Sequence, residues 1–255
     1  MPCSATSSAK QKKRQQRSTI KGLPPLKRYL NAWSRHHRSG GFGIHSPYAY
    51  RFVRQVWRQP LPYYAYAGIR QLQTTIKSAT TREQRRELDL ISYKEARLLF
   101  RVANFFNPAR ILQVGAATGV ESVAMLEVSR RSRLFLYDEQ LEQKALAVRV
   151  LRTQMDRVAC YDDVEVAADE FLQPVEGQAS LMALVNIPID EAVLTRLLDR
   201  GVVLVMRNLL RDASLRALYD ACCAHMSMGQ TYTNGKIAIL NPNPKLQRED
   251  FLLWL

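Results

Sequence analysis

The first third of this sequence contains no acidic residue. Between Met1 and Arg82 there are 16 Lys and Arg and no Asp or Glu, whereas 21 basic and 23 acidic residues nearly balance between Glu83 and Leu255. The formal net charge of +14 therefore comes from the first third. Such a segment attracts polyanions, so we expect residues 1–82 to bind nucleic acid or another polyanion such as an anionic membrane surface. The alternative is a solvated basic tail that only aids solubility.

Two further absences exclude classes of protein. No apolar run approaches the roughly 20 residues that span a bilayer, and the N-terminus lacks the apolar core of a secretory signal. The four cysteines form no C-x-x-C unit, and the adjacent Cys222 and Cys223 would point in different directions on a helix. This usage argues against a disulfide framework or a cysteine metal site and favours a reduced protein in the cytoplasm.

The chain divides into three parts. Residues 1–22 are polar and low in apolar content, which predicts a disordered basic tail. Residues 23–82 form a basic helical and aromatic extension in which Ser46 and Pro47 predict a helix start. Its linker from Pro60 to Tyr66 carries tyrosines that either stack on nucleic-acid bases or pack the extension against its domain. Residues 83–255 form the main domain.

Strands and helices alternate through the main domain. A capping box from Ser92 to Glu95 begins a helix, and five apolar strands follow, separated by helices. We place these strands near residues 111–114, 134–137, 164–168, 181–185 and 202–206. Two strands then flank Asn234-Gly235, which predicts a type I′ hairpin turn. The expected fold is α/β, a doubly wound, Rossmann-like, mostly parallel sheet of seven strands with a C-terminal antiparallel hairpin.

The most informative local feature is the turn that follows the first of these strands. The stretch Ile111-Leu-Gln-Val-Gly-Ala-Ala-Thr-Gly119 is a strand that meets a helix through small residues, and its two glycines leave backbone amides open to a ligand. About twenty residues later the next strand ends at Asp138-Glu139, where dinucleotide-type folds place a carboxylate that binds ribose hydroxyls.

With its terminal hairpin, the region from Ser92 to Leu255 resembles the class I S-adenosylmethionine-dependent methyltransferases. The stretch Gly43-Ile-His-Ser-Pro-Tyr48 is similar to the H-G-[IF]-H-S-P-F signature of one bacterial branch of methyltransferase-like proteins. That branch also ends in a short aromatic and apolar strand, as Asp250-Phe-Leu-Leu-Trp-Leu255 does.

The resemblance implies S-adenosylmethionine as the cofactor. Asp138, or Glu139 beside it, matches the acid that binds the ribose hydroxyls, and Asp169 lies where an acid often contacts the adenine amine. An exposed acid at a strand end is the alternative for Asp138. The turn residues that would cradle the methionine part of the cofactor are Gly115, Ala116, Ala117 and Gly119.

The catalytic side departs from the resemblance. Relatives carry an acidic pair after the fifth strand, where this chain has Met206-Arg207, so a divalent metal is not expected. Asn186 replaces an Asp-Gly pair and begins a stretch that partly resembles the N-P-P-[YF] loop of amino-methylating enzymes, which Ile187 and Pro188 do not complete. His45 is the remaining candidate base, provided that the extension folds over the pocket mouth; a structural histidine is the alternative.

Two functions follow from these features. The first is a metal-independent, S-adenosylmethionine-dependent methyltransferase whose acceptor the sequence does not identify. The second is a methyltransferase-like scaffold without catalysis, or a nucleic-acid-associated binding protein that uses its basic N-terminus.

Overall fold

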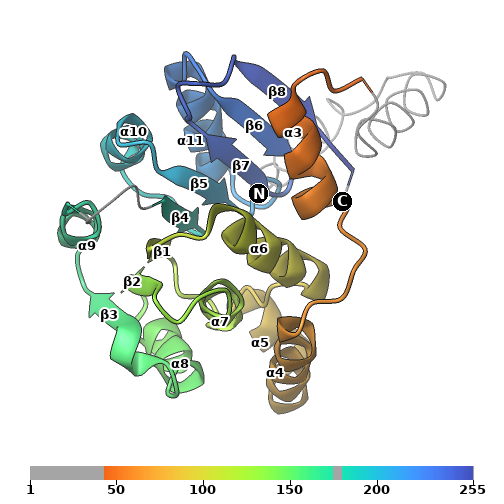
Figure 1. Cartoon of the computed structure of the whole chain (residues 1–255). Coiled ribbons are helices and arrows are strands. Elements are labelled where there is room, and N and C mark those ends of the chain that lie inside the picture. Colours follow the sequence, from red (N-terminus) through yellow and green to blue (C-terminus); the bar gives the residue numbers. More distant parts are fainter. Residues whose placement is uncertain (1–42, 175–179, 255) are drawn as a thin grey trace, which may run out of the picture.

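The computed structural model describes residues 43–174 and 180–254, so the predicted tail 1–22 and the start of the extension lie outside the described residues. Its centre is an eight-stranded sheet in the order β3-β2-β1-β4-β5-β7-β6-β8 (Figure 1). The strands β1 to β5 run parallel, β7 is antiparallel to both of its neighbours, and β8 is parallel to β6. The strands are β1 Arg110–Val114, β2 Arg133–Tyr137, β3 Val158–Tyr161, β4 Leu181–Val185, β5 Val203–Met206, β6 Gln230–Thr233, β7 Ala238–Asn241 and β8 Glu249–Leu252.

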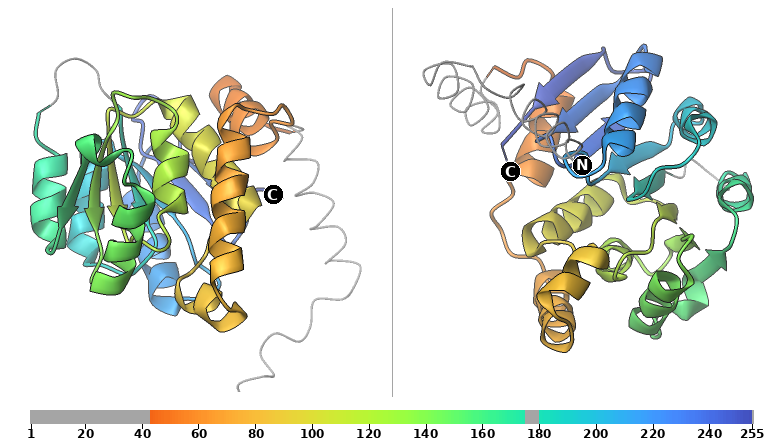
Figure 2. Two further views of the ribbon diagram at one scale, coloured as in Figure 1. Left: turned by 90° about the horizontal axis from the view of Figure 1, so that it is seen from below. Right: turned by 180° about the vertical axis from the view of Figure 1, so that it is seen from behind.

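Helices cover both faces of this sheet (Figure 2). One face packs with the extension and with α6, α7 and α8, and the other face packs with α9, α10 and α11. Each face therefore has its own apolar core, as a parallel sheet requires. The helices are α3 Pro47–Phe52, the π-helix η1 Val53–Trp57, α4 Ala65–Ala79, α5 Arg82–Glu87, α6 Tyr93–Phe106, α7 Val120–Leu126, α8 Leu141–Val150, the 3₁₀ turn η2 Met155–Arg157, α9 Val164–Phe171, α10 Glu191–Asp199 and α11 Ala213–His225.

The strand predicted at residues 164–168 is wrong, because these residues form the first turns of α9. The side chain of Asp163 accepts hydrogen bonds from the backbone amides of Glu165 and Val166 and so begins a helix there. The strand lies earlier, as β3, in a stretch for which the sequence predicted no element. The alternation of Val164 and Val166 resembles a strand, but the N-cap determines the local structure.

The sheet has eight strands instead of seven, since β8 adds to the edge of β6. The hairpin between β6 and β7 is confirmed, but its turn is not type I′. Gly235 has a φ of +87°, whereas Asn234 is not among the described residues with positive φ. The Asn234 side chain instead accepts hydrogen bonds from the amides of Lys236 and Ile237, which gives a longer loop.

The described part of the extension packs on the sheet beside β6 and β8, the strands formed by the last part of the chain. Ser46 caps α3 with Pro47 at its first position, as predicted, and the side chains of Phe52, Val53, Val56 and Trp57 are buried. The Phe52 ring stacks on Tyr232 of β6 at 4.1 Å between centroids, and Tyr232 stacks on Phe251 of β8 at 5.1 Å. The tyrosines Tyr63 and Tyr66 pack against Phe100 of α6, so this part of the linker packs against the domain.

Replacing Phe52 tests this packing. We expect Phe52→Ala to lower the free energy of unfolding by about 3–5 kcal/mol, because it removes a fully buried ring from three aromatic contacts. Tyr50→Ala is the matched control on the same helix, since Tyr50 is half exposed, and should cost about 0.5 kcal/mol or less. Urea denaturation measures both values. Equal losses in the two variants would show that α3 is not held by this stack.

Candidate functional site

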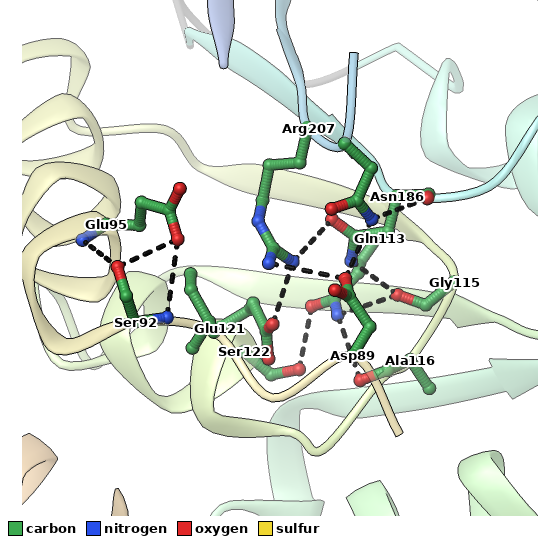
Figure 3. A network of polar contacts seen from close by, with 12 residues as sticks. Asp89, Ser92, Glu95, Gln113, Gly115, Ala116, Glu121, Ser122, Asn186 and Arg207 are labelled. Carbon is green, nitrogen blue, oxygen red and sulfur yellow. Dashed lines mark hydrogen bonds and ion pairs between the residues drawn. The ribbon is translucent and has the colours of Figure 1, made fainter. Parts of the chain in front are cut away.

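The parallel strands end together at one edge of the sheet. Val114, Val185 and Met206 are in register, so the residues that follow them are neighbours. The backbone hydrogen bonds continue past the strands: the Asn186 amide donates to the Val114 carbonyl at 2.8 Å, and the Arg207 amide donates to the Val185 carbonyl at 3.0 Å. Figure 3 shows Gly115, Asn186 and Arg207 gathered at this edge. Ligands of open α/β sheets bind at this edge, so it is the place to look for a site.

The turn after β1 has the backbone geometry of a ligand-binding loop. Gly115 and Gly119 have φ values of +87° and +77°, which suit glycine. Ala117 has a φ of +46°, and an L-residue with a Cβ pays about 1–2 kcal/mol for the left-handed conformation. The turn therefore keeps its shape although one of its left-handed positions is not glycine.

Asp138 holds this turn with its own carboxylate. Oδ2 accepts the Ala116 amide at 2.5 Å, and Oδ1 accepts the Gln140 amide at 2.7 Å. The residue is 3% exposed. Asp138, the acid predicted to bind a ribose, thus lies at the predicted strand end and beside the predicted loop. Both of its oxygens accept hydrogen bonds from the chain itself.

Gln113 supports the turn from beneath, and our sequence interpretation missed it. Its Nε2 donates to the Gly115 carbonyl at 3.1 Å and to the Ala116 carbonyl at 3.3 Å, while its Oε1 accepts the Ser122 hydroxyl at 2.7 Å. The side chain is fully buried. A polar residue in the middle of an apolar strand was the signal for this role, because a buried amide needs partners.

A buried guanidinium connects the loops at this edge. Arg207 Nη1 donates to Glu121 Oε1 of α7 at 2.8 Å and to Asn186 Oδ1 at 3.0 Å, and Nη2 lies 3.3 Å from a carboxylate oxygen of Asp89 (Figure 3). Asn186 in turn donates from Nδ2 to the Gly115 carbonyl at 2.7 Å. The predicted acceptor-side residues Asn186 and Arg207 are therefore brought together, in a network that holds the turn in place.

Glu121 is the fully buried partner in this network. Burial raises the pKa of its carboxyl group to about 7, and the nearby Arg207 charge opposes this rise. Its Oε2 and the hydroxyl of Thr118, one turn earlier, are buried without a hydrogen-bond partner among the described residues. Because one oxygen of this buried carboxyl group has no partner among the described residues, the protonation state of Glu121 affects the stability of the fold.

The space around the two glycines is already filled. A Cβ added to Gly115 would lie 3.0 Å from Asn186 Cβ and 3.1 Å from Ile187 Cγ2. One added to Gly119 would lie 3.0 Å from Ala147 Cα and 3.3 Å from Val150 Cβ, both on α8. Every residue of 115–120 is buried. Packing against the chain itself is therefore a sufficient reason for both glycines.

The other predicted residues lie away from the turn. His45 is exposed next to Ser46, which hydrogen-bonds Gln230 at the start of β6; β6 runs parallel to β5, so this is the opposite edge of the sheet. Asp169 lies on α9, because the strand assignment there was wrong, and pairs with Arg196 of α10 at 2.9 Å. Glu139 is exposed after β2. The structure does not bring His45 or Asp169 to the Gly115 turn.

A cavity of about 250 Å³ opens beside Arg207, without reaching the turn. It lies between the start of α6 and the loops after β5 and β6, and both acids and bases line it: Asp89, Glu95, Arg207, Arg211 and Lys236. Among the described residues, no three His, Cys, Asp or Glu side chains come together as metal ligands would. In the same part of the chain, no helix has the length and apolar content needed to cross a membrane.

Comparison with solved structures identifies the fold. A Podospora anserina methyltransferase with bound S-adenosylhomocysteine superposes with a TM-score of 0.50 at 12% identity, covering 87% of this chain and 98% of the other. A Geobacter sulfurreducens methyltransferase matches at 0.49 and 17% identity, over 72% and 94% of the two chains. A Streptomyces achromogenes O-methyltransferase in complex with S-adenosylmethionine matches at 0.47 and 15%, over 73% and 94%.

The chain thus has the Rossmann-like methyltransferase fold. No family model matches the sequence. No curated protein matches it either.

The residues at the turn do not fit this cofactor as they are arranged. A nucleoside needs open space over the turn and a carboxylate after β2 that it can reach. Here Ile187 and α8 lie where a Cβ of either glycine would point, and Asp138 is 3% exposed with each oxygen bonded to a backbone amide. Backbone shape and the position of the acid agree with the fold, whereas the space next to both glycines is occupied by the chain.

Comparing two alanine variants tests the shape of the turn. Ala116→Gly and Ala117→Gly each remove a buried methyl group and each add a glycine to the unfolded chain. Only Ala117 has a positive φ, so Ala117→Gly should lower the unfolding free energy by about 1–2 kcal/mol less than Ala116→Gly does. Urea denaturation of both variants measures the difference, and equal losses would contradict the left-handed turn.

The buried carboxyl group predicts a pH dependence. Because the folded pKa of Glu121 lies near 7, above its ordinary 4.5, the folded state binds the proton more tightly. The contribution of protonated Glu121 to the free energy of unfolding is therefore fully present below pH 4.5. It is lost as the pH rises through 7, and the total loss is about 3 kcal/mol. Glu121→Gln keeps an acceptor for Arg207 but does not titrate. The unfolding free energy of the parent minus that of this variant should fall by this amount between pH 4.5 and 8. Parallel pH profiles would contradict the assignment.

Proposed function

We propose that this chain is a methyltransferase-like scaffold that does not catalyse methyl transfer. The observation that supports the proposal is the buried turn. Gly115 to Val120 are buried, and both carboxylate oxygens of Asp138 accept hydrogen bonds from backbone amides of the chain. The buried network around Arg207 supports the same conclusion, since it uses the side chains that would face an acceptor.

A working S-adenosylmethionine-dependent methyltransferase is the second candidate. The left-handed backbone at Gly115, Ala117 and Gly119, and the acid directly after β2, favour it. In that case Gly115 to Gly119 would cradle the methionine part, and Asp138 or Glu139 would bind the ribose. For this function Ile187 and α8 have to move away from the glycines first. The acceptor and the H-S-P-like signature around His45 remain expectations from sequence.

The basic first third is a separate part of the proposal. Its 16 cations without an acid favour a polyanionic partner such as nucleic acid for residues 1–82. The described cysteines are free, which favours a reducing, cytoplasmic location.

Calorimetric titration with S-adenosylhomocysteine tests the scaffold proposal. We expect no saturation below about 1 mM, which corresponds to binding weaker than roughly −4 kcal/mol. Micromolar binding by the folded parent chain would overturn the proposal in favour of the methyltransferase.

A double variant then tests what closes the crevice. Ile187→Ala removes the two γ-carbons that lie against Gly115, and Val150→Ala removes the γ-methyl groups of the α8 side chain beside Gly119; the backbone of Ala147 stays 3.0 Å from a Cβ at Gly119. The double variant should allow measurable binding if side chains and not the α8 backbone block the cofactor. Ile189→Ala is the matched control: it truncates another partly buried isoleucine of the same loop, which is not among the atoms nearest to Gly115.

A further inference from the structure

A second cavity lies far from the turn and differs from the first in its charge. It has a volume of about 250 Å³ and lies between the end of η1, one face of α6 and the segment after β8. Among the residues that the structure describes, no carboxylate lines it, whereas Asp89 and Glu95 balance the bases of the cavity beside Arg207. The side chains that line it are Trp57, Arg58, Gln59, Lys94, Arg97, Arg101 and Trp254.

The cations of this cavity come from one stripe of α6. Lys94, Arg97 and Arg101 are spaced at i, i+3 and i+7, which places them on the same face of the helix. None of the three forms an ion pair with a carboxylate of the described residues.

Two of these cations are held rigidly. Arg101 is 4% exposed; its Nε donates to the Val56 carbonyl and its Nη1 donates to the Tyr66 hydroxyl at 3.1 Å. The Arg97 guanidinium lies over the rings of Tyr66 and Tyr93, at 5.4 and 5.0 Å from their centroids. Among the described residues the Arg97 Nε has no hydrogen-bond partner, but it is buried, so a ligand can reach only the outer nitrogens of this guanidinium. A cation held in one orientation by two rings is preorganised for an anionic ligand.

An indole lies at the same cavity. Trp254 is half exposed, and its carbonyl accepts the Trp57 indole N–H at 2.9 Å, which fixes the backbone of this segment against η1. Aromatic rings beside a cationic groove are the elements with which proteins bind single-stranded nucleic acid: bases stack on the rings, while cations contact the phosphates. In a duplex the bases stack on one another and are not available to such a ring.

We propose that this cavity binds one nucleotide unit of a single-stranded nucleic acid. Lys94 and Arg97 contact the phosphate, the buried Arg101 adds positive charge from behind them, and a base stacks on Trp254. The volume is below the range of roughly 300–1,000 Å³ typical for whole drug-sized ligands, so it suits one unit of a longer strand. The site is independent of the closed turn at Gly115, and a failure here leaves the scaffold proposal untouched.

The test uses the full chain and fluorescently labelled fifteen-nucleotide oligonucleotides, with binding measured by anisotropy between 50 and 300 mM salt. Oligo-dT and oligo-rU distinguish DNA from RNA, and a duplex of the same length is the third probe. Residues 1–42 carry ten Lys and Arg, so background binding is present in every variant. The differences between variants report on the cavity.

Trp254→Ala should weaken binding of single strands by roughly 5- to 150-fold, which is the usual loss of one stacked base, and Trp254→Phe should restore most of it. Lys94→Gln should reduce the slope of log K against log salt by about 0.7. Lys77→Gln is its matched control, since it removes the same charge from an exposed position on α4 outside the cavity.

Affinities of Trp254→Ala and Lys94→Gln equal to those of the parent and of Lys77→Gln would overturn the proposal. Equal loss of duplex and single-strand binding in Trp254→Ala would also overturn it. Binding that depends on Trp254 only with anionic lipid vesicles would do the same. Thermal unfolding of each variant confirms that it is folded, and Lys94→Gln, an exposed change, keeps the test valid should Trp254→Ala lose β8.

Discussion

The buried guanidinium of Arg207 is the interaction on which the candidate site depends. A charge that is 4% exposed requires partners, and Arg207 finds them on three different segments, at Glu121, Asn186 and Asp89. Removal of any one partner leaves a charge or a dipole unsatisfied in the interior. The loops after β4 and β5 and the start of α7 are therefore held in one arrangement, and Asn186 passes this constraint on to the Gly115 carbonyl.

This constraint explains why the turn is closed. Asn186 and Ile187 lie over Gly115 because the network fixes the loop after β4, and Asp138 fixes the other side of the turn through the Ala116 amide. An acid in place of Arg207 would repel Glu121, so the loop would need a different arrangement. The replacement of carboxylate by arginine after β5 thus changes more than the chemistry of that position: it supplies the cation that makes a buried Glu121 tolerable.

Most of the fold could be predicted from the sequence because local signals agreed with it. The Ser92 capping box, the Ser46–Pro47 helix start and the apolar strands β1, β2, β4 and β5 lie where they were expected. The errors arose where one signal competed with another, as at Asp163, whose capping side chain outweighs the alternating valines after it. A terminal strand was expected at Asp250–Leu255 from the resemblance, but the count of seven left it out of the sheet, because its pairing with β6 is a long-range contact that no local pattern specifies.

The sequence predicts where the candidate site lies, but not whether the space beside its glycines is open to a ligand. Gly115, Gly119, Asp138, Asn186 and Arg207 all lie at one edge of the sheet, as parallel strands dictate. Whether glycines leave room for a ligand or for the chain itself depends on Ile187 and on α8, which approach them only in the folded protein. A glycine turn in a sequence shows that something lies close to the backbone. In this chain the atoms next to the two glycines are those of Asn186, Ile187 and α8, contacts between distant segments that no pattern in the sequence specifies.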